Sequence, residues 1–238
     1  MRVLITGFKD FLPHDAKPPE ARKCTNNPAC LILKGLKTQA DTQSLEATWN
    51  AHEYVHYEDY DVVMHIGLGV YDGQHCLLER GAFNCTNGMA DVNKCVMHGP
   101  IDAEGPEVLN PRLQYSDLSN VNTNTLPIQF ADARKENTYV CNHLHWHALK
   151  RVEDGTLHAA YFLHVPYPEC IPTLQATVTH LMDHLCNLYR GTSVDPYRSA
   201  IHVSEFHPCV EACWKQIKSG RKPRPKSRTK PGSTPRTK

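Results

Sequence analysis

The sequence predicts an α/β fold, a three-layer α/β/α sandwich around a mixed, largely parallel sheet. Two observations support this prediction. Short apolar runs typical of buried strands alternate along the chain with segments of helical character, and one long segment near residue 180 carries apolar residues at helical spacing. With 238 residues, the chain is long enough for one substantial domain with a well-buried core.

Five short runs are predicted to be strands because they are apolar and end near Gly, Pro or polar residues. They are Arg2–Thr6, 61–68 (DVVMHIGL), 76–84 (CLLERGAFN), 125–130 (TLPIQF) and Ala159–Val165 (AAYFLHV). The third run is unusual because Glu79 and Arg80 stand in its middle, where an unpaired charge would be costly.

Three segments are predicted to be helices. The segment from Pro28 has Asn27 available as a cap and a proline in its first turn. A second amphipathic helix begins at Cys141. The third, Ile171–Tyr189, should lie on the sheet through apolar residues at helical spacing, which are Leu174, Val178, Leu181, Leu185 and Leu188.

Charge divides the chain into a folded body and a tail. Of the 26 Lys and Arg residues, ten lie in 215–238, which holds no acid, so residues 1–214 carry sixteen basic against 25 acidic side chains, a formal charge of −9. We therefore expect a domain over 1–190, an extension over 191–214 and a disordered basic tail over 215–238. An acidic body argues against a primary nucleic-acid function, although RKPRPKSRTK at 221–230 could contact nucleic acid, anionic lipid or an import receptor, or simply be solvated.

The N-terminus and the cysteines indicate a cytoplasmic location. The apolar run in MRVLITGF is far too short for a signal-peptide core, and no run of about 18 apolar residues occurs in the sequence. Without an export signal, the ten cysteines are expected in a reducing compartment, where disulfides are not the default. No membrane partner is expected.

The stretch 138–147, TYVCNHLHWH, leaves four possible roles for its cysteine: half of a disulfide, a metal ligand, a buried small side chain or a nucleophile. Within a helix, His143 and His147 share one face and Cys141 and His145 another, so at most two ligands converge and we expect no metal site. His207, Cys209 and Cys213 form a second, weaker cluster.

A nucleophile fits better because Cys141 precedes a helix, whose dipole favours the thiolate. His164 is the best-placed base, near the end of an apolar strand, and Glu79 lies inside another strand, where it could orient that base. Each of these residues alone is more often structural. Together Glu79, Cys141 and His164 form a usable triad.

These segments resemble the type I pyroglutamyl peptidases (pyrrolidone-carboxylate peptidases), cysteine peptidases that remove an N-terminal pyroglutamyl residue. The match is carried by TGFKDF at 6–11, LERGAFN at 78–84, YVCN at 139–142 and HVP at 164–166, and it covers about residues 1–190. The resemblance implies a phosphorylase/hydrolase-like fold, a catalytic peptidase domain over 1–190, a divergent eukaryotic-type member, and no cofactor.

By the same resemblance, Cys141 is the nucleophile, His164 the base and Glu79 the third member of the triad. The walls of the lactam pocket map to Phe8, Phe11, Tyr139 and Val140. Two positions depart from the bacterial pattern: Leu68 replaces a glutamine, and Glu136-Asn137 replace Ala-Gly. Two alternatives stay open, a homologue that binds pyroglutamyl peptides without cleaving them and a thiol hydrolase of another acyl group.

Overall fold

A computed structural model of the chain describes residues 1–10, 27–70, 75–110, 127–167 and 171–190, all within one compact unit, Met1–Val194. The expected extension at 191–214 and basic tail at 215–238 lie outside the described residues, as does Phe11. Among the described helices, none combines the length and the apolar character needed to cross a membrane.

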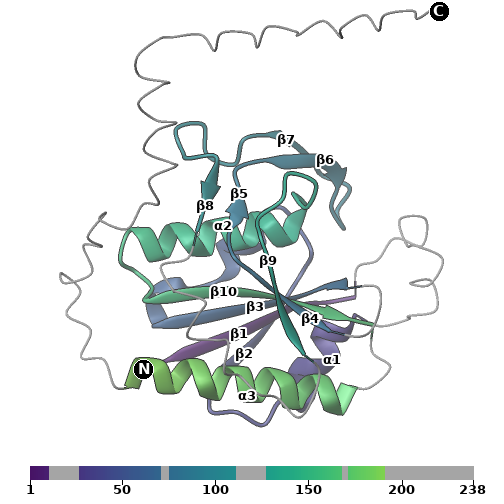
Figure 1. Ribbon diagram of the computed structural model, residues 1–238. Helices are drawn as coiled ribbons and strands as arrows, with labels where there is room; N and C mark the ends of the chain where they lie inside the picture. The colour runs from purple at the N-terminus through teal and green to yellow at the C-terminus, as the bar shows by residue number, and fades with distance from the viewer. Residues whose placement is uncertain (11–26, 71–74, 111–126, 168–170, 191–238) are drawn as a thin grey trace, which may run out of the picture. The chain divides into compact units, whose positions relative to one another are not determined.

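The centre of the fold is a six-stranded sheet (Figure 1). Its strands, in spatial order, are β2 (Asp41–Leu45), β1 (Val3–Phe8), β3 (Val62–Val70), β10 (Ala159–Pro166), β4 (Cys76–Glu79) and β9 (Ile128–Ala131). Neighbours are parallel except β10 and β4, which are antiparallel. The sheet is therefore mixed and largely parallel, as predicted.

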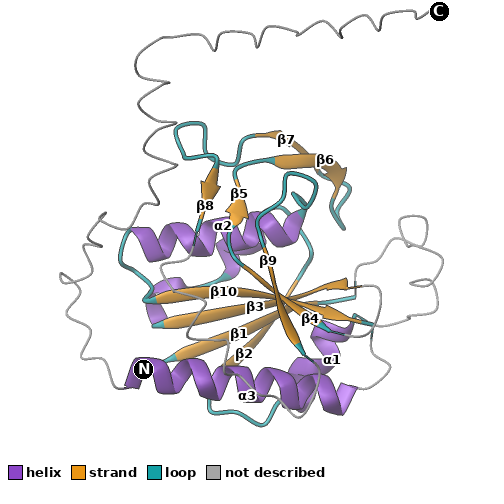
Figure 2. Cartoon of the chain, viewed as in Figure 1, coloured by secondary structure: helices purple, strands orange, loops and turns teal. Residues whose placement is uncertain are grey.

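Helices cover both faces of this sheet (Figure 2). On one face, α1 (Pro28–Gly35) and α3 (Ile171–Arg190) pack on alternate strand residues such as Tyr161 and Leu163. On the other face, α2 (Val140–Glu153) packs on the intervening residues, including Ala160 and Phe162. Because successive side chains of a strand point to opposite faces, one buried strand supplies both cores. The predicted three-layer sandwich is confirmed.

Helix α1 begins where the sequence predicts. Asn27 is the N-cap, and its side chain accepts a hydrogen bond from the Ala29 backbone N–H at 3.0 Å. Pro28 follows at the first helical position, where the missing N–H costs nothing. The segment after Gly35 is extended, and Leu36 closes the helix.

The single strand predicted over 76–84 is wrong. The structure breaks it into β4, which ends at Glu79, and β5 (Ala82–Phe83), which pairs with β8 (Val108–Leu109) in a separate sheet. Gly81 permits this turn, because a Cβ there would lie 2.5 Å from the Leu109 carbonyl oxygen. The break leaves Glu79 at the end of a strand.

Several elements were not predicted from the sequence. They are β2, a hairpin of β6 (Thr86–Ala90) and β7 (Val96–Gly99), the strand β8, and two 3-10 helices, η2 (Ala51–Tyr54) and η3 (Tyr57–Asp59). Tyr139, directly before α2, donates its hydroxyl to the Ala90 carbonyl at 2.8 Å. The hairpin is thereby joined to the start of α2.

Candidate active site

Cys141 is the second residue of α2 and only 6 % exposed. The helix begins after Tyr139, whose backbone is extended and whose side chain does not cap the helix. The Tyr139 side chain therefore accepts no hydrogen bond from the N–H groups in the first turn of α2. They point from the helix start, where the positive end of the helix dipole lies.

His164 and Glu79 form a buried pair on the neighbouring strands. His164, on β10, and Glu79, the last residue of β4, are 4 % and 7 % exposed. The Nδ1 atom of His164 lies 2.6 Å from Oε1 of Glu79. Because the two strands are antiparallel, with His164 opposite Leu77, the end of β4 reaches the middle of the sheet and places the carboxylate beside the ring.

His164 also contacts Cys141, so the imidazole lies between the thiol and the carboxylate. Burial by itself lowers the pKa of His164. The hydrogen bonds and negative charges of Cys141 and Glu79 outweigh it and raise the pKa to about 10. Since Nδ1 faces Glu79, Nε2 is the nitrogen left for Cys141. The three residues that the sequence singles out are thus brought together.

Two glycines of β3 make room for this arrangement. A Cβ at Gly67 would lie 3.1 Å from the sulfur of Cys141, and one at Gly69 would lie 2.4 Å from the His164 ring. Both glycines therefore face the site. Leu68 stands between them and, by strand alternation, points to the opposite face, so it does not occupy the space beside the thiol.

Asn142 fixes the first turn of α2 to the segment that follows Glu79. Its Oδ1 accepts a hydrogen bond from the Phe83 N–H at 2.7 Å, and its Nδ2 donates to the Phe83 carbonyl at 2.8 Å. The amide thereby behaves like a strand partner of β5. Sequence analysis missed this role, because only the position next to Cys141 hinted at it.

A small pocket opens at the three residues. Besides Glu79, Cys141 and His164, it is lined by Gly81, Ala133, Arg134, Asn137, Asn142, His145 and Phe162. His145, one turn after Cys141, is buried and neither ring nitrogen has a hydrogen-bond partner within the described chain. Its position was visible only as a residue sharing a helix face with Cys141. A larger cavity of about 840 Å³, at the start of β1, holds none of these residues.

Three of the residues expected as pocket walls, Phe8, Tyr139 and Val140, lie nearby but outside this lining. Phe8, Val140 and Cys141 belong to one buried core cluster, and Tyr139 packs against it. Tyr139 also makes an edge-to-face contact with Trp49, with the ring centroids 5.5 Å apart. Their role as walls of a substrate pocket stays a prediction. Asn137, which replaces a glycine of the bacterial pattern, does not have a left-handed backbone, since among the described non-glycine residues positive φ is found at Lys94.

Solved structures with a similar fold are pyrrolidone carboxyl peptidases. A single-residue variant of the enzyme from Pyrococcus furiosus is 20% identical, with 79% of this chain and 100% of that chain covered and a TM-score of 0.65. The enzyme from Thermococcus litoralis is 19% identical, with 80% and 96% covered and a TM-score of 0.65. The enzyme from Thermus thermophilus is 22% identical, with 76% and 99% covered and a TM-score of 0.62. These likenesses establish the fold.

The family assignment comes from the sequence as a whole. No curated protein matched the chain. The model of the pyroglutamyl peptidase family matches residues 1–202, which include Glu79, Cys141 and His164. The chain therefore belongs to the pyroglutamyl peptidase family.

Proposed function

We propose that this chain hydrolyses the amide bond after an N-terminal pyroglutamyl residue, with Cys141 as nucleophile, His164 as acid and base, and Glu79 as the residue that orients His164. The observation that supports this assignment best is the buried imidazole of His164, in contact with Cys141 and 2.6 Å from Glu79. A thiol at a helix start beside a protonated imidazole is the environment in which cysteines act as nucleophiles.

The first half of the reaction acylates the enzyme. The Cys141 thiolate attacks the carbonyl carbon that joins the pyroglutamyl residue to the next residue, not the lactam carbonyl. The electrons of the C=O double bond move onto the oxygen. We assign the stabilisation of this oxyanion to backbone N–H groups at the start of α2, that of Cys141 included. His164 then gives its proton to the leaving nitrogen, the C–N bond breaks, and a thioester to Cys141 remains.

The second half releases pyroglutamate. The neutral imidazole of His164 takes a proton from a water molecule, and the resulting hydroxide attacks the thioester carbonyl. The C–S bond breaks, which returns the sulfur as thiolate and leaves His164 protonated. The product forms as the carboxylic acid, whose proton passes to solvent, and the enzyme returns to the ion pair with which the cycle began.

Glu79 keeps the ring in position. Its carboxylate accepts the Nδ1–H bond, which leaves Nε2 facing Cys141 and stabilises the imidazolium that exists before acylation and after deacylation. The bond also compensates the burial of both groups, which without a partner would be costly.

A pyroglutamyl residue suits an enclosed, largely apolar site because its lactam ring carries no ammonium group. An ordinary N-terminus would bring a charge that burial penalises unless it is paired. We assign the walls of the lactam site to Phe8, Phe11, Tyr139 and Val140. The substrates are peptides with an N-terminal pyroglutamyl residue, and a cytoplasmic location, where Cys141 stays reduced, remains a prediction.

The proposal is tested with matched fluorogenic amides, one carrying pyroglutamate and one carrying proline, the same ring without the lactam carbonyl. We expect release from the pyroglutamyl amide alone, and loss of that activity in Cys141→Ala. Binding of the pyroglutamyl amide without turnover would instead indicate a non-cleaving homologue. Turnover of neither amide but of other acyl esters would indicate a different thiol hydrolase.

A further inference from the structure

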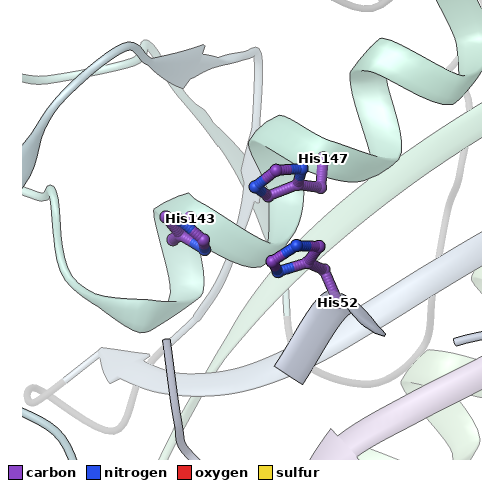
Figure 3. Close-up of side chains that lie close together, drawn as sticks. All are labelled: His52, His143 and His147. Atoms are coloured by element: carbon purple, nitrogen blue, oxygen red, sulfur yellow. The ribbon is translucent and has the colours of Figure 1, made fainter. Parts of the chain in front are cut away.

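Three histidines from two distant segments meet beside the first two turns of α2 (Figure 3). His143 and His147 lie one helical turn apart on α2, and His52 comes from η2. One ring nitrogen of each lies within 4.8 Å of those of the other two. Figure 3 shows the three rings facing one another.

This cluster is separate from the active site. On a helix, residues 143 and 147 share one face, whereas residues 141 and 145 share another. Accordingly, Cys141 and His145 line the small pocket, and none of the three clustered histidines does. Within the described residues, two ring contacts lead from the cluster toward the site: His143 makes an edge-to-face contact with Trp49, which makes the same kind of contact with Tyr139.

Three imidazoles with room for a water molecule form a common zinc site in proteins. Zinc–nitrogen distances of about 2.0–2.1 Å place tetrahedral ligand atoms roughly 3.4 Å apart. The rings of His52 and His147 are stacked in parallel, 3.5 Å between centroids and 3° between planes. Parallel rings cannot aim both lone pairs at one ion, so binding requires one ring to rotate out of the stack.

At pH 7, protons do not occupy the lone pairs of the cluster. Burial lowers the pKa of His52, that of His143 to about 4 and that of His147 to about 3. The rings are therefore neutral at pH 7, with lone pairs free to coordinate. Glu53 adds a negative charge near His52. Arg151 adds a positive charge, which disfavours a cation, but Arg151 is paired with Asp154 at 3.2 Å.

We propose that His52, His143 and His147 form a zinc site with water as the fourth ligand. Because its ligands come from η2 and α2, this site links η2 to the start of α2. The site stabilises the segment that carries Cys141 and Tyr139 and takes no part in peptide hydrolysis. Its free energy of binding adds to the stability of the folded state, because the unfolded chain does not hold the three rings together.

The test uses the full chain without a polyhistidine tag, stripped with a chelator, in a Cys141→Ser background so that zinc cannot bind the catalytic thiol. We compare the melting temperature with and without one equivalent of Zn²⁺ in this parent, in His52→Gln and in His147→Gln. His158→Gln, at an exposed histidine outside the cluster, is the matched control. We expect Zn²⁺ to raise the melting temperature of the parent and control equally, and chelator competition to show at least tenfold weaker binding in both cluster variants.

X-ray absorption of the zinc-loaded parent gives a second readout that does not depend on a variant folding. We expect a first shell of nitrogen and oxygen, with no sulfur. Sulfur in the shell would place zinc on cysteines, and equal zinc stabilisation in all variants would place it elsewhere. No zinc stabilisation in the parent would leave the cluster as ring packing alone. Each of these results overturns the proposal.

Discussion

Glu79 and His164 lie 2.6 Å apart, Oε1 to Nδ1, across an antiparallel strand pair in an otherwise parallel sheet. Because β4 runs antiparallel to β10 and Leu78 pairs with Leu163, the last residue of β4 lies beside the middle of β10, within reach of His164. The contact therefore depends on the direction of β4, and its catalytic and structural roles can be separated by experiment.

Replacing the carboxylate by an amide tests its catalytic role. We expect Glu79→Gln to lower kcat by roughly 10 to 10⁴-fold, because the amide carries no charge to stabilise the imidazolium and can select the wrong tautomer. kcat, KM and the melting temperature should be measured together, with Glu104→Gln at an exposed position as control. A variant that melts early but keeps full turnover while folded would leave only a Cys–His dyad.

The same pair predicts how stability changes at alkaline pH. The folded-state pKa of His164 is raised to about 10 from an ordinary value of 6.5. Protonated His164 therefore stabilises the fold fully below pH 6.5, and this contribution is lost as the pH rises toward 10. Urea unfolding should show this loss in the wild type and a flatter profile in Glu79→Gln. If the wild type and Glu79→Gln lost stability equally as the pH rose, protonation of the pair would not be coupled to folding.

At acidic pH, His145 should lower the stability of the fold as the pH falls, whereas the contribution of His164 is lost as the pH rises. Burial lowers its pKa to about 3, so the folded protein keeps it neutral while the unfolded chain binds a proton below pH 6.5. Stability should therefore fall as the pH drops from 6.5 toward 3, because the folded protein excludes a proton that the unfolded chain binds. Urea unfolding of His145→Leu should have a shallower acid slope, and an unchanged slope would contradict the assignment.

Replacing Asn142 should lower the free energy of unfolding. Asn142→Asp keeps an acceptor for the Phe83 N–H but places an oxygen against the Phe83 carbonyl. We expect a loss of about 1–3 kcal/mol in the free energy of unfolding, since a part-buried carbonyl loses its donor. Asn93→Asp, on an exposed turn, is the control. Equal stability of the two variants would show that the Phe83 contact contributes nothing.

Adding a methyl group at Gly69 should slow catalysis by displacing the His164 ring. A methyl group there would meet the His164 ring at 2.4 Å, so the ring must shift in Gly69→Ala. A misplacement of about 1 Å costs on the order of 10²-fold in rate, and we expect kcat to fall by that amount. The rate of Cys141 alkylation by iodoacetamide should fall with it. Unchanged kcat in a stably folded variant would show that the ring tolerates the methyl.

Local patterns sufficed to predict much of this fold. Pro28 after Asn27 marked the start of α1, and the apolar run around Phe162 marked β10, because these signals are contained in a few neighbouring residues. Strand β2 was missed because its sequence, DTQSL, is mostly exposed and polar and joins the sheet only through pairing with β1.

For the site, the sequence supplied the residue types but not the contacts that position them. Cys141 and His164 were recognised from their places at element ends, and Glu79 as a charged residue inside a predicted strand. The close approach of Gly69 to His164 depends on strand register, which no single segment reveals. His52 is separated from His143 by 90 residues, so the sequence of the helix alone contains only two of the three candidate ligands.

The measurement that tests the central claim most directly is mass spectrometry of the protein after reaction with a pyroglutamyl chloromethyl ketone, which alkylates a thiolate held beside a bound pyroglutamyl group. We expect one adduct, on the peptide that contains Cys141, with activity lost in proportion to labelling. The adduct should be absent from Cys141→Ala and slower to form in His164→Ala. Stoichiometric labelling of another cysteine, such as Cys76 or Cys85, with Cys141 unmodified and activity lost, would contradict the assignment of the nucleophile.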